Sequence, residues 1–174
     1  MNDSIGKRLE SIRINKVLPH IEGNLLDIGC GNNKLTKNYG SGIGVDVYDW
    51  GNVDMIVEDS SNIDIPDKSF NTITILAALN HIPNRERVII ECHRLLQTEG
   101  KIIITMIPPR ISTIWHFLRR PWDIDQTKRG MKEGEVYGMS KKEIIDLFNA
   151  NQFKLVANSS FMFGINQLFI FQKN

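Results

Sequence analysis

Short apolar runs alternate with charged, helix-like stretches along most of the chain. Ile5, Leu9 and Ile12 recur at helical spacing, which predicts an amphipathic helix over residues 4–18 that ends near the next proline. The following apolar run, residues 24–29, is short and ends in a glycine turn, as expected for a buried strand. The start of the chain therefore predicts a helix followed by a strand.

The same alternation continues to the end of the chain. Further apolar runs predict strands at residues 42–47, 55–57, 71–76, 101–107, 153–157 and 167–171. Helices are predicted at residues 33–39, 84–96 and 140–148, the last opened by the capping-box pattern Ser140-Lys141-Lys142-Glu143. Strands that alternate with helices indicate an α/β fold with a parallel sheet covered on both faces, and the last two strands are suited to pair antiparallel. In such sheets, ligands bind beyond the carboxyl ends of the strands, where the strand order reverses.

Length and charge narrow the function classes. The chain has 174 residues, which predicts a single domain over residues 1–174. Its net charge of +1 provides no bulk field for nucleic acid or an anionic membrane, so neither is an expected partner. No apolar run is long enough to span a bilayer, and the first residues lack the apolar core of a signal peptide. Cys30 and Cys92 are the only cysteines, so a disulfide framework is not expected, and the expected location is the cytoplasm.

The first chemical signal is the turn Asp27-Ile28-Gly29-Cys30-Gly31, which follows the first predicted strand. One glycine permits a tight turn and the other lets the backbone approach a ligand closely, while the next helix offers unpaired N–H groups. Asp46, at the end of the second predicted strand, can accept both hydroxyls of a ribose. Taken alone, the glycine turn could be an ordinary small turn, and Asp46 could be a helix cap or a solvated loop residue. Together, in strand–turn–helix–strand order, they indicate an adenosyl cofactor.

Several short motifs between residues 25 and 107 follow one another in a recognisable order. They are Leu26-Asp27-Ile28-Gly29-Cys30-Gly31, Gly44-Val45-Asp46, Glu58-Asp59-Ser60, Ile65-Pro66-Asp67-Lys68-Ser69-Phe70, Leu79-Asn80-His81-Ile82-Pro83 and Arg94-Leu95-Leu96-Gln97-Thr98-Glu99-Gly100-Lys101. This combination resembles the class I S-adenosylmethionine-dependent methyltransferases, especially their small-molecule, type 11-like branch. The resemblance implies a Rossmann-like, doubly wound, mostly parallel sheet of about seven strands with an antiparallel last strand. It also implies S-adenosyl-L-methionine as the cofactor and methyl transfer to a small-molecule acceptor as the activity.

The resemblance implies that the glycine turn holds the methionine and ribose part of the cofactor. Asp27 begins this turn, and Gly29, Cys30 and Gly31 would line the ligand. Ala77, just past the fourth predicted strand, would help bind the methionine amino group through its carbonyl.

The adenosine part is implied to lie against residues that follow the second and third strands. Asp46 would hold the ribose hydroxyls, and Val47 would pack on adenine. Asp59 would accept a hydrogen bond from the adenine amino group, and the N–H of Ser60 would reach a ring nitrogen.

Three asparagines depart from the family pattern. Asn33 stands where a third glycine is expected, and asparagine tolerates a left-handed backbone better than most residues, so the turn can persist. Asn71 replaces an aspartate before the fourth strand, and Asn80-His81 replaces a pair of histidines. The last change bears on catalysis more than on cofactor binding.

His81 is the candidate catalytic residue. Methyl transfer from a sulfonium requires alignment and exclusion of water, and it requires a base only where the acceptor loses a proton early. His81 follows the fourth strand, near the expected reactive end of the cofactor, and its side chain titrates in the useful range. A histidine that bonds locally at the start of a helix explains the same position. No His, Cys or carboxylate cluster has metal-ligand spacing, so no metal is expected.

Residues 108–138 match the family least and are predicted to form a lid over the mouth of the active site. Trp115, His116, Trp122 and Tyr137 would face the acceptor, and neighbouring arginines fit an anionic acceptor. The same pattern fits equally an amphipathic helix that packs its tryptophans into the core. A third alternative is a lipid-linked substrate bound at a membrane surface without stable insertion.

Two rival functions would use the same residues. A NAD-dependent oxidoreductase would use the glycine turn and Asp46, but Lys34 stands where close helix–strand packing favours glycine or alanine. A non-catalytic S-adenosylmethionine-binding module would explain the three altered asparagines. Nucleic acid is not an expected substrate, because no basic groove is evident in the sequence. The oligomeric state is left open.

Overall fold

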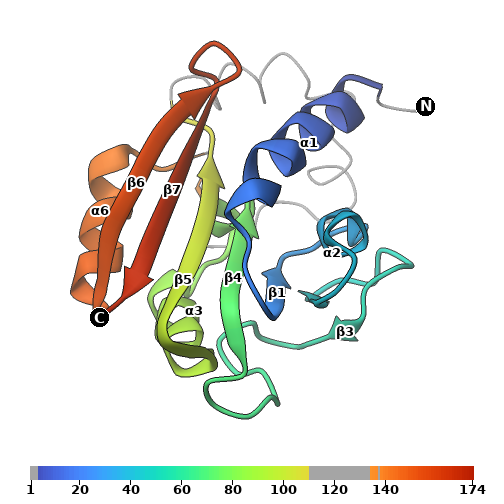
Figure 1. Ribbon diagram of the computed structural model, residues 1–174. Coiled ribbons are helices and arrows are strands. Elements are labelled where there is room, and N and C mark those ends of the chain that lie inside the picture. The colour runs from blue at the N-terminus through green and yellow to red at the C-terminus, as the bar shows by residue number, and fades with distance from the viewer. Residues whose placement is uncertain (1–3, 110–133, 137) are drawn as a thin grey trace.

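The computed structural model describes residues 4–109, 134–136 and 138–174 of the chain. One sheet of seven strands runs through the molecule with helices packed against it (Figure 1). The elements are α1 (Ser4–Val17), the 3-10 turn η1 (Leu18–His20), β1 (Leu25–Ile28), α2 (Lys34–Tyr39), β2 (Ile43–Asp46), β3 (Met55–Ile56), β4 (Phe70–Leu76), the 3-10 turn η2 (Leu79–His81), α3 (Arg85–Leu95), β5 (Leu96–Met106), α6 (Lys141–Ala150), β6 (Phe153–Phe161) and β7 (Asn166–Lys173).

The strand order across the sheet is β3-β2-β1-β4-β5-β7-β6. Strands β1 to β5 pair in parallel, and β7 runs antiparallel to both β5 and β6. The chain builds β1, β2 and β3 outward to one edge and then returns to place β4 on the other side of β1. The strand order therefore reverses between β1 and β4, which is where ligands bind in this kind of sheet.

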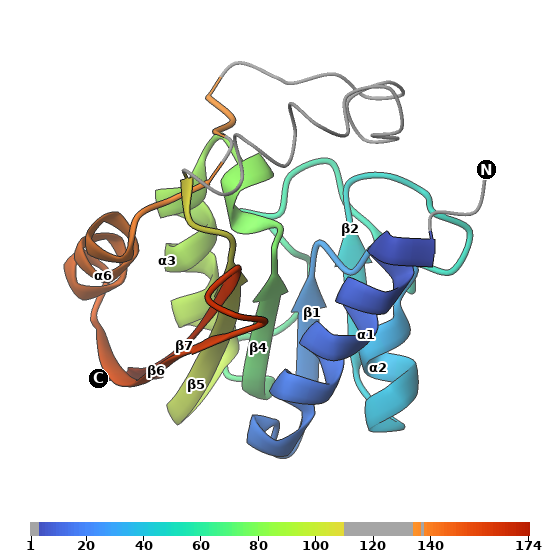
Figure 2. The same ribbon diagram turned by 90° about the horizontal axis from the view of Figure 1, so that it is seen from above.

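Helices cover both faces of the sheet, as the two views show (Figures 1 and 2). Buried side chains of α1 and α2 pack in one cluster with Ile103 of β5, whereas those of α3 and α6 pack in a second cluster with Ile102 and Ile104. Successive residues of a strand point to opposite faces, so this one strand contributes to both clusters. Strands buried on both faces read as continuous apolar runs, which explains why β1 was recognisable in the sequence.

The antiparallel end of the sheet is held by aromatic packing. Phe148 of α6 stacks on Phe171 of β7 with ring centroids 4.1 Å apart, and it meets Phe153 of β6 edge-on at 5.7 Å. The capping box that opens α6 is present, because Ser140 Oγ accepts from the Glu143 N–H and the Glu143 carboxylate accepts from the Ser140 N–H. The helix is thereby fixed beside the terminal strand pair.

The predicted α/β fold with an antiparallel last strand is confirmed. One prediction about the first helix is wrong. Ile12 was expected on its buried apolar face, but its side chain is 40% exposed. Ile14 and Val17 are the buried residues instead, and they pack with Leu25 beneath the helix. The helix contacts the sheet through its last turns, so the apolar positions there decide which face is buried. Strand β5 also begins at Leu96, earlier than predicted, because that residue pairs with Phe70 of β4.

Candidate cofactor and active site

A cavity of about 590 Å³ lies at the carboxyl ends of β1, β2 and β4. This volume falls in the range of small-molecule sites. Eight of the residues predicted from the sequence line it: Gly29, Gly31, Asp46, Val47, Asp59, Ser60, Ala77 and His81. They come from four separate parts of the sequence, and the reversal of strand order gathers them in one place.

The glycine turn after β1 needs its glycines for two reasons. Gly29 and Gly31 have φ values of +71° and +53°, in the left-handed region that residues with a Cβ avoid. A Cβ on Gly29 would lie only 2.6 Å from the Cβ of Ala78, so the two segments could not approach as they do. The N–H groups of Gly29 and Cys30 donate to the Val45 carbonyl at 2.8 and 3.1 Å, which holds the turn against the end of β2.

Asn33 takes the left-handed conformation that was expected of it, with φ of +56°. Its Nδ2 donates to Asp54 Oδ2 at 2.7 Å and to the Asn52 carbonyl at 3.1 Å, and its Oδ1 accepts from Thr36 Oγ1 at 2.5 Å. A Cβ on Gly44 would lie 2.0 Å from Asn33 Oδ1, so the side chain occupies space that this glycine leaves open. The asparagine thus replaces a third glycine by anchoring α2 to the loop after β2.

Asp46 connects the end of β2 to the glycine turn. One carboxylate oxygen accepts from the Gly31 N–H at 3.0 Å, and the other accepts from the Tyr48 N–H at 3.0 Å. The side chain is buried yet lines the cavity. Each oxygen still has a lone pair available, so the same carboxylate can both hold the turn and accept hydrogen bonds from a ligand.

Asp59 and Ser60 lie on the loop after β3. The Asp59 carboxylate accepts from Asn84 Nδ2 at 3.0 Å and from the Ser61 N–H at 2.8 Å. These bonds, the one from Asn84 first, hold the pKa of Asp59 below its ordinary value, so the group is an ionised acceptor at neutral pH. Ser60 is buried and lines the cavity beside it.

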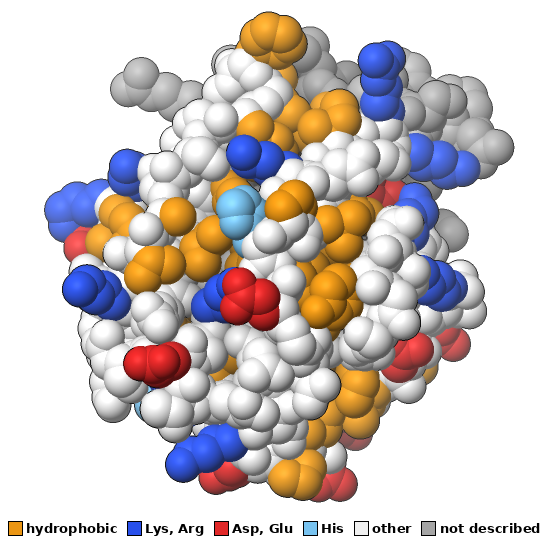
Figure 3. Space-filling view, viewed as in Figure 1, with side chains coloured by type: hydrophobic (Ala, Val, Ile, Leu, Met, Phe, Trp, Pro, Cys, Tyr) orange, Lys and Arg blue, Asp and Glu red, His pale blue; other side chains and the backbone are white. Residues whose placement is uncertain are grey.

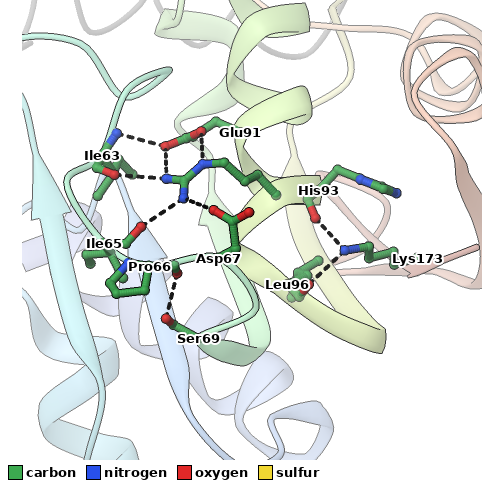
Figure 4. Close-up of polar contacts among 10 residues, drawn as sticks. Ile63, Ile65, Pro66, Asp67, Ser69, Glu91, His93, Leu96 and Lys173 are labelled. Carbon is green, nitrogen blue, oxygen red and sulfur yellow. Dashed lines mark hydrogen bonds and ion pairs between the residues drawn. The ribbon is translucent and has the colours of Figure 1, made fainter.

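A network of hydrogen bonds around one arginine, called the arginine cluster below, fixes the segment between this loop and β4 (Figure 4). Arg94 donates to both oxygens of Glu91, at 2.9 and 2.7 Å, and to the Ile63 and Ile65 carbonyls at 3.0 and 2.8 Å. It also donates to Asp67 at 2.6 Å, while Glu91 accepts from the Ile63 N–H at 2.8 Å. The two motifs around residues 65–70 and 94–101 are therefore parts of one contact, which supports the loop that carries Asp59.

His81 sits beside a buried carboxylate that the sequence did not predict. Its Nδ1 lies 3.5 Å from Glu135 Oε2, and the Glu135 side chain is only 1% exposed against 29% for His81. The Glu135 segment is tied to η2, because the Val136 N–H donates to the Asn80 carbonyl at 3.0 Å and Asn80 Nδ2 donates back to the Val136 carbonyl at 3.2 Å. A histidine and a carboxylate therefore share one wall of the cavity.

Ala77, at the end of β4, has the left-handed φ of +52°. Its N–H donates to the Thr105 carbonyl at 3.0 Å, and the residue lines the cavity. A non-glycine residue held in this region costs free energy and commonly marks a functional site.

Two predicted cofactor residues, Asp27 and Cys30, are not among the cavity-lining residues. Asp27 is buried within β1, where its Oδ1 accepts from Thr74 Oγ1 at 2.6 Å, and burial raises its pKa to about 7. Burial raises the pKa of the Cys30 thiol to about 12, which excludes it as a thiolate nucleophile at neutral pH.

The four predicted acceptor-binding residues, Trp115, His116, Trp122 and Tyr137, lie outside the described residues. Most of the predicted lid, residues 108–138, does so too, and its role therefore stays a prediction. Glu10 and Arg13 of α1 also line the cavity and were missed. On a helix with charges at many positions, no local pattern separates them from solvated side chains.

The surface carries mixed charge. On the face shown in Figure 3, Lys and Arg side chains alternate with acidic and uncharged ones over the described elements and form no continuous basic strip. Among the described helices, none combines the length and the apolar composition that crossing a bilayer requires. Across residues 4–109, 134–136 and 138–174, no three His, Cys, Asp or Glu side chains group as metal ligands.

Known proteins share this sequence pattern and fold. The family model of the methyltransferase domain matches residues 26–104. A demethylmenaquinone methyltransferase from Thermotoga maritima is 31% identical over 74 residues, which are 40% of this chain and 32% of that protein. The chain therefore spans about a third of the length of this relative.

Solved structures are similar over nearly the whole chain. A Thermotoga maritima S-adenosylmethionine-dependent methyltransferase, described as a possible histamine N-methyltransferase, matches with a TM-score of 0.69 and 17% identity, over 93% of this chain and 88% of its own. The 1,6-didemethyltoxoflavin-N1-methyltransferase of Burkholderia thailandensis, solved with that compound and S-adenosylhomocysteine bound, matches with a TM-score of 0.68 and 16% identity, over 94% of this chain and 77% of its own. At these identities, the likeness concerns the fold.

The family match covers the glycine turn, Asp46 and the strands up to β5, and the terminal strand pair completes the same sheet. By its motifs and its fold, this chain is similar to the class I S-adenosylmethionine-dependent methyltransferases.

Proposed function

We propose that this chain binds S-adenosylmethionine in the cavity and catalyses methyl transfer to a small-molecule acceptor. The observation that carries the proposal is that Gly29, Asp46, Asp59 and His81 all line one cavity at the switch point of the sheet. Carboxylates that could accept hydrogen bonds from adenosine, a glycine turn that would allow close approach and a histidine surround this one space, which supports the proposal.

The donor and acceptor set fits the cofactor. Gly29 and Gly31 would admit the methionine and ribose part, and the Ala77 carbonyl would accept from its amino group. Asp46 keeps lone pairs for the two ribose hydroxyls beyond the bonds that it accepts from backbone N–H groups. Val47 is 41% exposed and lines the cavity, so it offers apolar surface for adenine.

The adenine edge would meet Asp59 and Ser60. The Asp59 carboxylate is already held in place by Asn84, so it would accept from an amino group without losing further side-chain freedom. The arginine cluster at Arg94 holds the same loop from the other side (Figure 4).

The bound cofactor supplies a methyl group on a sulfonium, which is transferred by displacement at carbon. His81 would accept the proton that the acceptor loses, and it would return that proton to solvent, to which its side chain is 29% exposed. Glu135, 3.5 Å from the ring, would orient the imidazole and stabilise the charge it gains. The walls around the cavity would exclude water from the reacting atoms.

A small acceptor is supported by the size of the space and by relatives. The cavity of about 590 Å³ must hold the cofactor as well, which leaves room for a compact acceptor. One structural relative binds 1,6-didemethyltoxoflavin, and another is described as a possible histamine methyltransferase. An anionic or lipid-linked acceptor is the alternative, and acidic small molecules and lipid vesicles offered as acceptors would test it.

Calorimetry tests the cofactor. S-adenosylhomocysteine is expected to bind to the wild-type chain, and NADH is not. Asp46→Asn should weaken S-adenosylhomocysteine binding about 10- to 100-fold, because it removes charge-assisted hydrogen bonds. Asp49→Asn is the matched control, since this exposed aspartate lies on the same loop but not among the cavity-lining residues. Tight NADH binding without S-adenosylhomocysteine binding would replace the proposal with the oxidoreductase alternative.

Turnover tests the catalytic role. Labelled S-adenosylmethionine and the protein are incubated with the small-molecule fraction of a cell extract, and the labelled product is identified by mass spectrometry. His81→Gln should lower turnover about 100-fold or more, whereas His20→Gln, a change outside the cavity, should leave it unchanged. Cofactor binding without transfer to any fraction would favour the non-catalytic module.

Glu135→Gln separates positioning from folding. The variant keeps the shape of the side chain and removes its charge, so turnover should fall about tenfold while the melting temperature changes little. The acidic limb of the pH profile should move to lower pH, because the charged imidazole loses a neighbouring carboxylate. An unchanged pH profile would remove Glu135 from the proposed chemistry.

A further inference from the structure

Glu135 lies on a short segment, residues 134–136, that is held against the 3-10 turn η2, which carries His81. The Val136 N–H donates to the Asn80 carbonyl at 3.0 Å, and Asn80 Nδ2 donates back to the Val136 carbonyl at 3.2 Å. Asn80 is buried, and these two bonds join positions that are 56 residues apart in the sequence. Holding such distant segments together costs conformational entropy, so the hydrogen bonds between them decide where Glu135 lies.

Arg85, the first residue of α3, bonds to both segments at once. Its Nε donates to the Leu79 carbonyl at 3.1 Å, and its Nη2 donates to the Asn80 carbonyl at 3.4 Å. The same Nη2 donates to the Gly134 carbonyl at 2.6 Å. A cation at the start of a helix is disfavoured by the helix dipole, so the helix itself gives no reason for an arginine here. The three carbonyl contacts give that reason, because a planar guanidinium offers several donors in a fixed arrangement.

The segment approaches η2 closely at Gly134. Its φ is +89°, in the left-handed region, and a Cβ at this position would lie 3.0 Å from the Cβ of Pro83. Such a distance is tighter than ordinary van der Waals contact, so a larger residue would push the segment away from the turn. Glycine therefore fits the backbone of this segment to the residues that follow His81.

Arg85 can influence His81 in two ways, and the two have opposite signs. Burial lowers the pKa of Arg85, and the carboxylates of Glu135 and Glu143 oppose this effect, so the guanidinium remains charged near Glu135. As a charge alone, it disfavours the positive form of the His81 imidazole. As a donor that seats residues 134–136, it keeps a carboxylate 3.5 Å from Nδ1 of that imidazole, which favours the positive form. Removing Arg85 therefore moves the His81 titration to higher pH in the first case and to lower pH in the second.

We propose that Arg85 and Asn80 are positioning residues that seat residues 134–136 on η2 and thereby hold the Glu135 carboxylate against His81. Neither is among the cavity-lining residues that the structure describes, so both act through Glu135 rather than on the cofactor or the acceptor. The consequence for methyl transfer rests on the function proposed above, whereas the placement of the carboxylate can be measured without any turnover.

Histidine titration by NMR tests the placement in the full-length protein. The chain has four histidines, and His81→Gln assigns the signal of His81. The midpoint of its titration is compared in wild type, Glu135→Gln, Asn80→Ala, Arg85→Met, Arg85→Lys and Arg87→Met. Arg87 is the matched control, because it is an exposed arginine on the same helix and is not among the described cavity-lining residues. Five other ionisable side chains of the described cavity wall stay unchanged in every variant: Glu10, Arg13, Asp46, Glu58 and Asp59.

Glu135→Gln should move the midpoint to lower pH, and Asn80→Ala and Arg85→Met should produce part or all of the same shift. Arg85→Lys should shift it in the same direction, because lysine keeps the charge but cannot meet three carbonyls at once. Arg87→Met should match wild type. A shift to higher pH in Arg85→Met, or wild-type midpoints in Asn80→Ala and Arg85→Lys, overturns the proposal, and so does an unchanged midpoint in Glu135→Gln. Melting temperatures check folding, and Asn80→Ala keeps the test available if Arg85→Met does not fold, because it removes only one side-chain donor.

Kinetics then show whether the placement serves methyl transfer. Arg85→Lys and Asn80→Ala should lower kcat about 3- to 10-fold and change the KM of S-adenosylmethionine less than about twofold, because only the His81–Glu135 pair is displaced. The expected midpoint shifts with an unchanged kcat would refute a contribution of the two residues to catalysis. The expected midpoint shifts in a wild-type protein that transfers no methyl group would support the positioning and remove the proposed function.

Discussion

The buried carboxyl group of Asp27 should make the free energy of unfolding depend on pH. It is 3% exposed on the central strand β1, and burial raises its pKa from the ordinary 3.8 to about 7. The bond from Thr74 Oγ1 opposes this shift, and the charge of Asp46 adds to it. Asp27→Asn keeps an oxygen that can accept from Thr74 and removes the ionisation.

The size and sign follow from these pKa values. The folded chain holds the Asp27 proton more tightly than the unfolded chain, so ionisation favours unfolding as the pH rises from about 4 to about 7. A shift of about three pKa units corresponds to about 4 kcal/mol, at about 1.4 kcal/mol per unit. Below pH 4 the group is protonated in both states and costs nothing, whereas above pH 7 the cost is complete and constant.

Urea unfolding at several pH values between 4 and 8, followed by circular dichroism, measures the effect. At pH 8, Asp27→Asn should unfold with a free energy up to about 4 kcal/mol higher than wild type, and the difference should vanish near pH 4. Asp64→Asn, at an exposed position, is the matched control and should follow the wild-type curve. Parallel curves for Asp27→Asn and wild type across the whole range would refute the reasoning.

Three further changes test the glycine turn and the contacts of Arg94. Gly29→Ala should weaken S-adenosylhomocysteine binding more than tenfold by calorimetry, because its Cβ would lie 2.6 Å from the Cβ of Ala78. Gly51 also has a positive φ, of +86°, but no atom lies within 4 Å of the added Cβ, so Gly51→Ala should lower the free energy of unfolding by about 1–2 kcal/mol and leave binding unchanged. Asn33→Ala should be less stable than Asn33→Gly by about 1 kcal/mol in urea unfolding, since only the glycine variant tolerates a φ of +56°, and equal stabilities would contradict this. Arg94→Met should lower the free energy of unfolding by about 2–3 kcal/mol, because it leaves the buried carboxylate of Glu91 without its cation. Lys142→Met breaks only the exposed pair with Asp146 and should lower it by about 0.5 kcal/mol or less. Similar losses for the two cations would show that the cluster adds no more than a surface ion pair.

The strands were predictable because a strand that is buried on both faces has apolar residues at nearly every position of its sequence. β1 is buried at all four positions, so it reads as an apolar run that only Asp27 interrupts. Strand ends were less predictable, because they depend on pairing. β5 is extended back to Leu96 by its contact with Phe70, and β6 continues to Phe161 opposite Asn166. Such pairings join distant segments and leave no local pattern.

The residues of the candidate site were predictable where they form a glycine turn or directly follow a strand. Gly29, Gly31 and Asp46 fall in this group, because the turn and the carboxylate follow apolar runs. Arg13 and Glu135 were missed for a physical reason. A charged side chain near a helix end or in a loop is solvated in most proteins, and only the tertiary fold brings these two to the cavity.

The three asparagines that depart from the family pattern give little support to a non-catalytic protein. Asn33 anchors the loop after β2, and Asn71 accepts from the Asn24 N–H at 2.9 Å and donates to Gln97 Oε1 at 2.9 Å. Asn80 exchanges hydrogen bonds with the backbone of Val136. None of the three is among the cavity-lining residues that the structure describes. The changes therefore affect how segments are held together, whereas Asp46, Asp59 and the His81–Glu135 pair line the cavity.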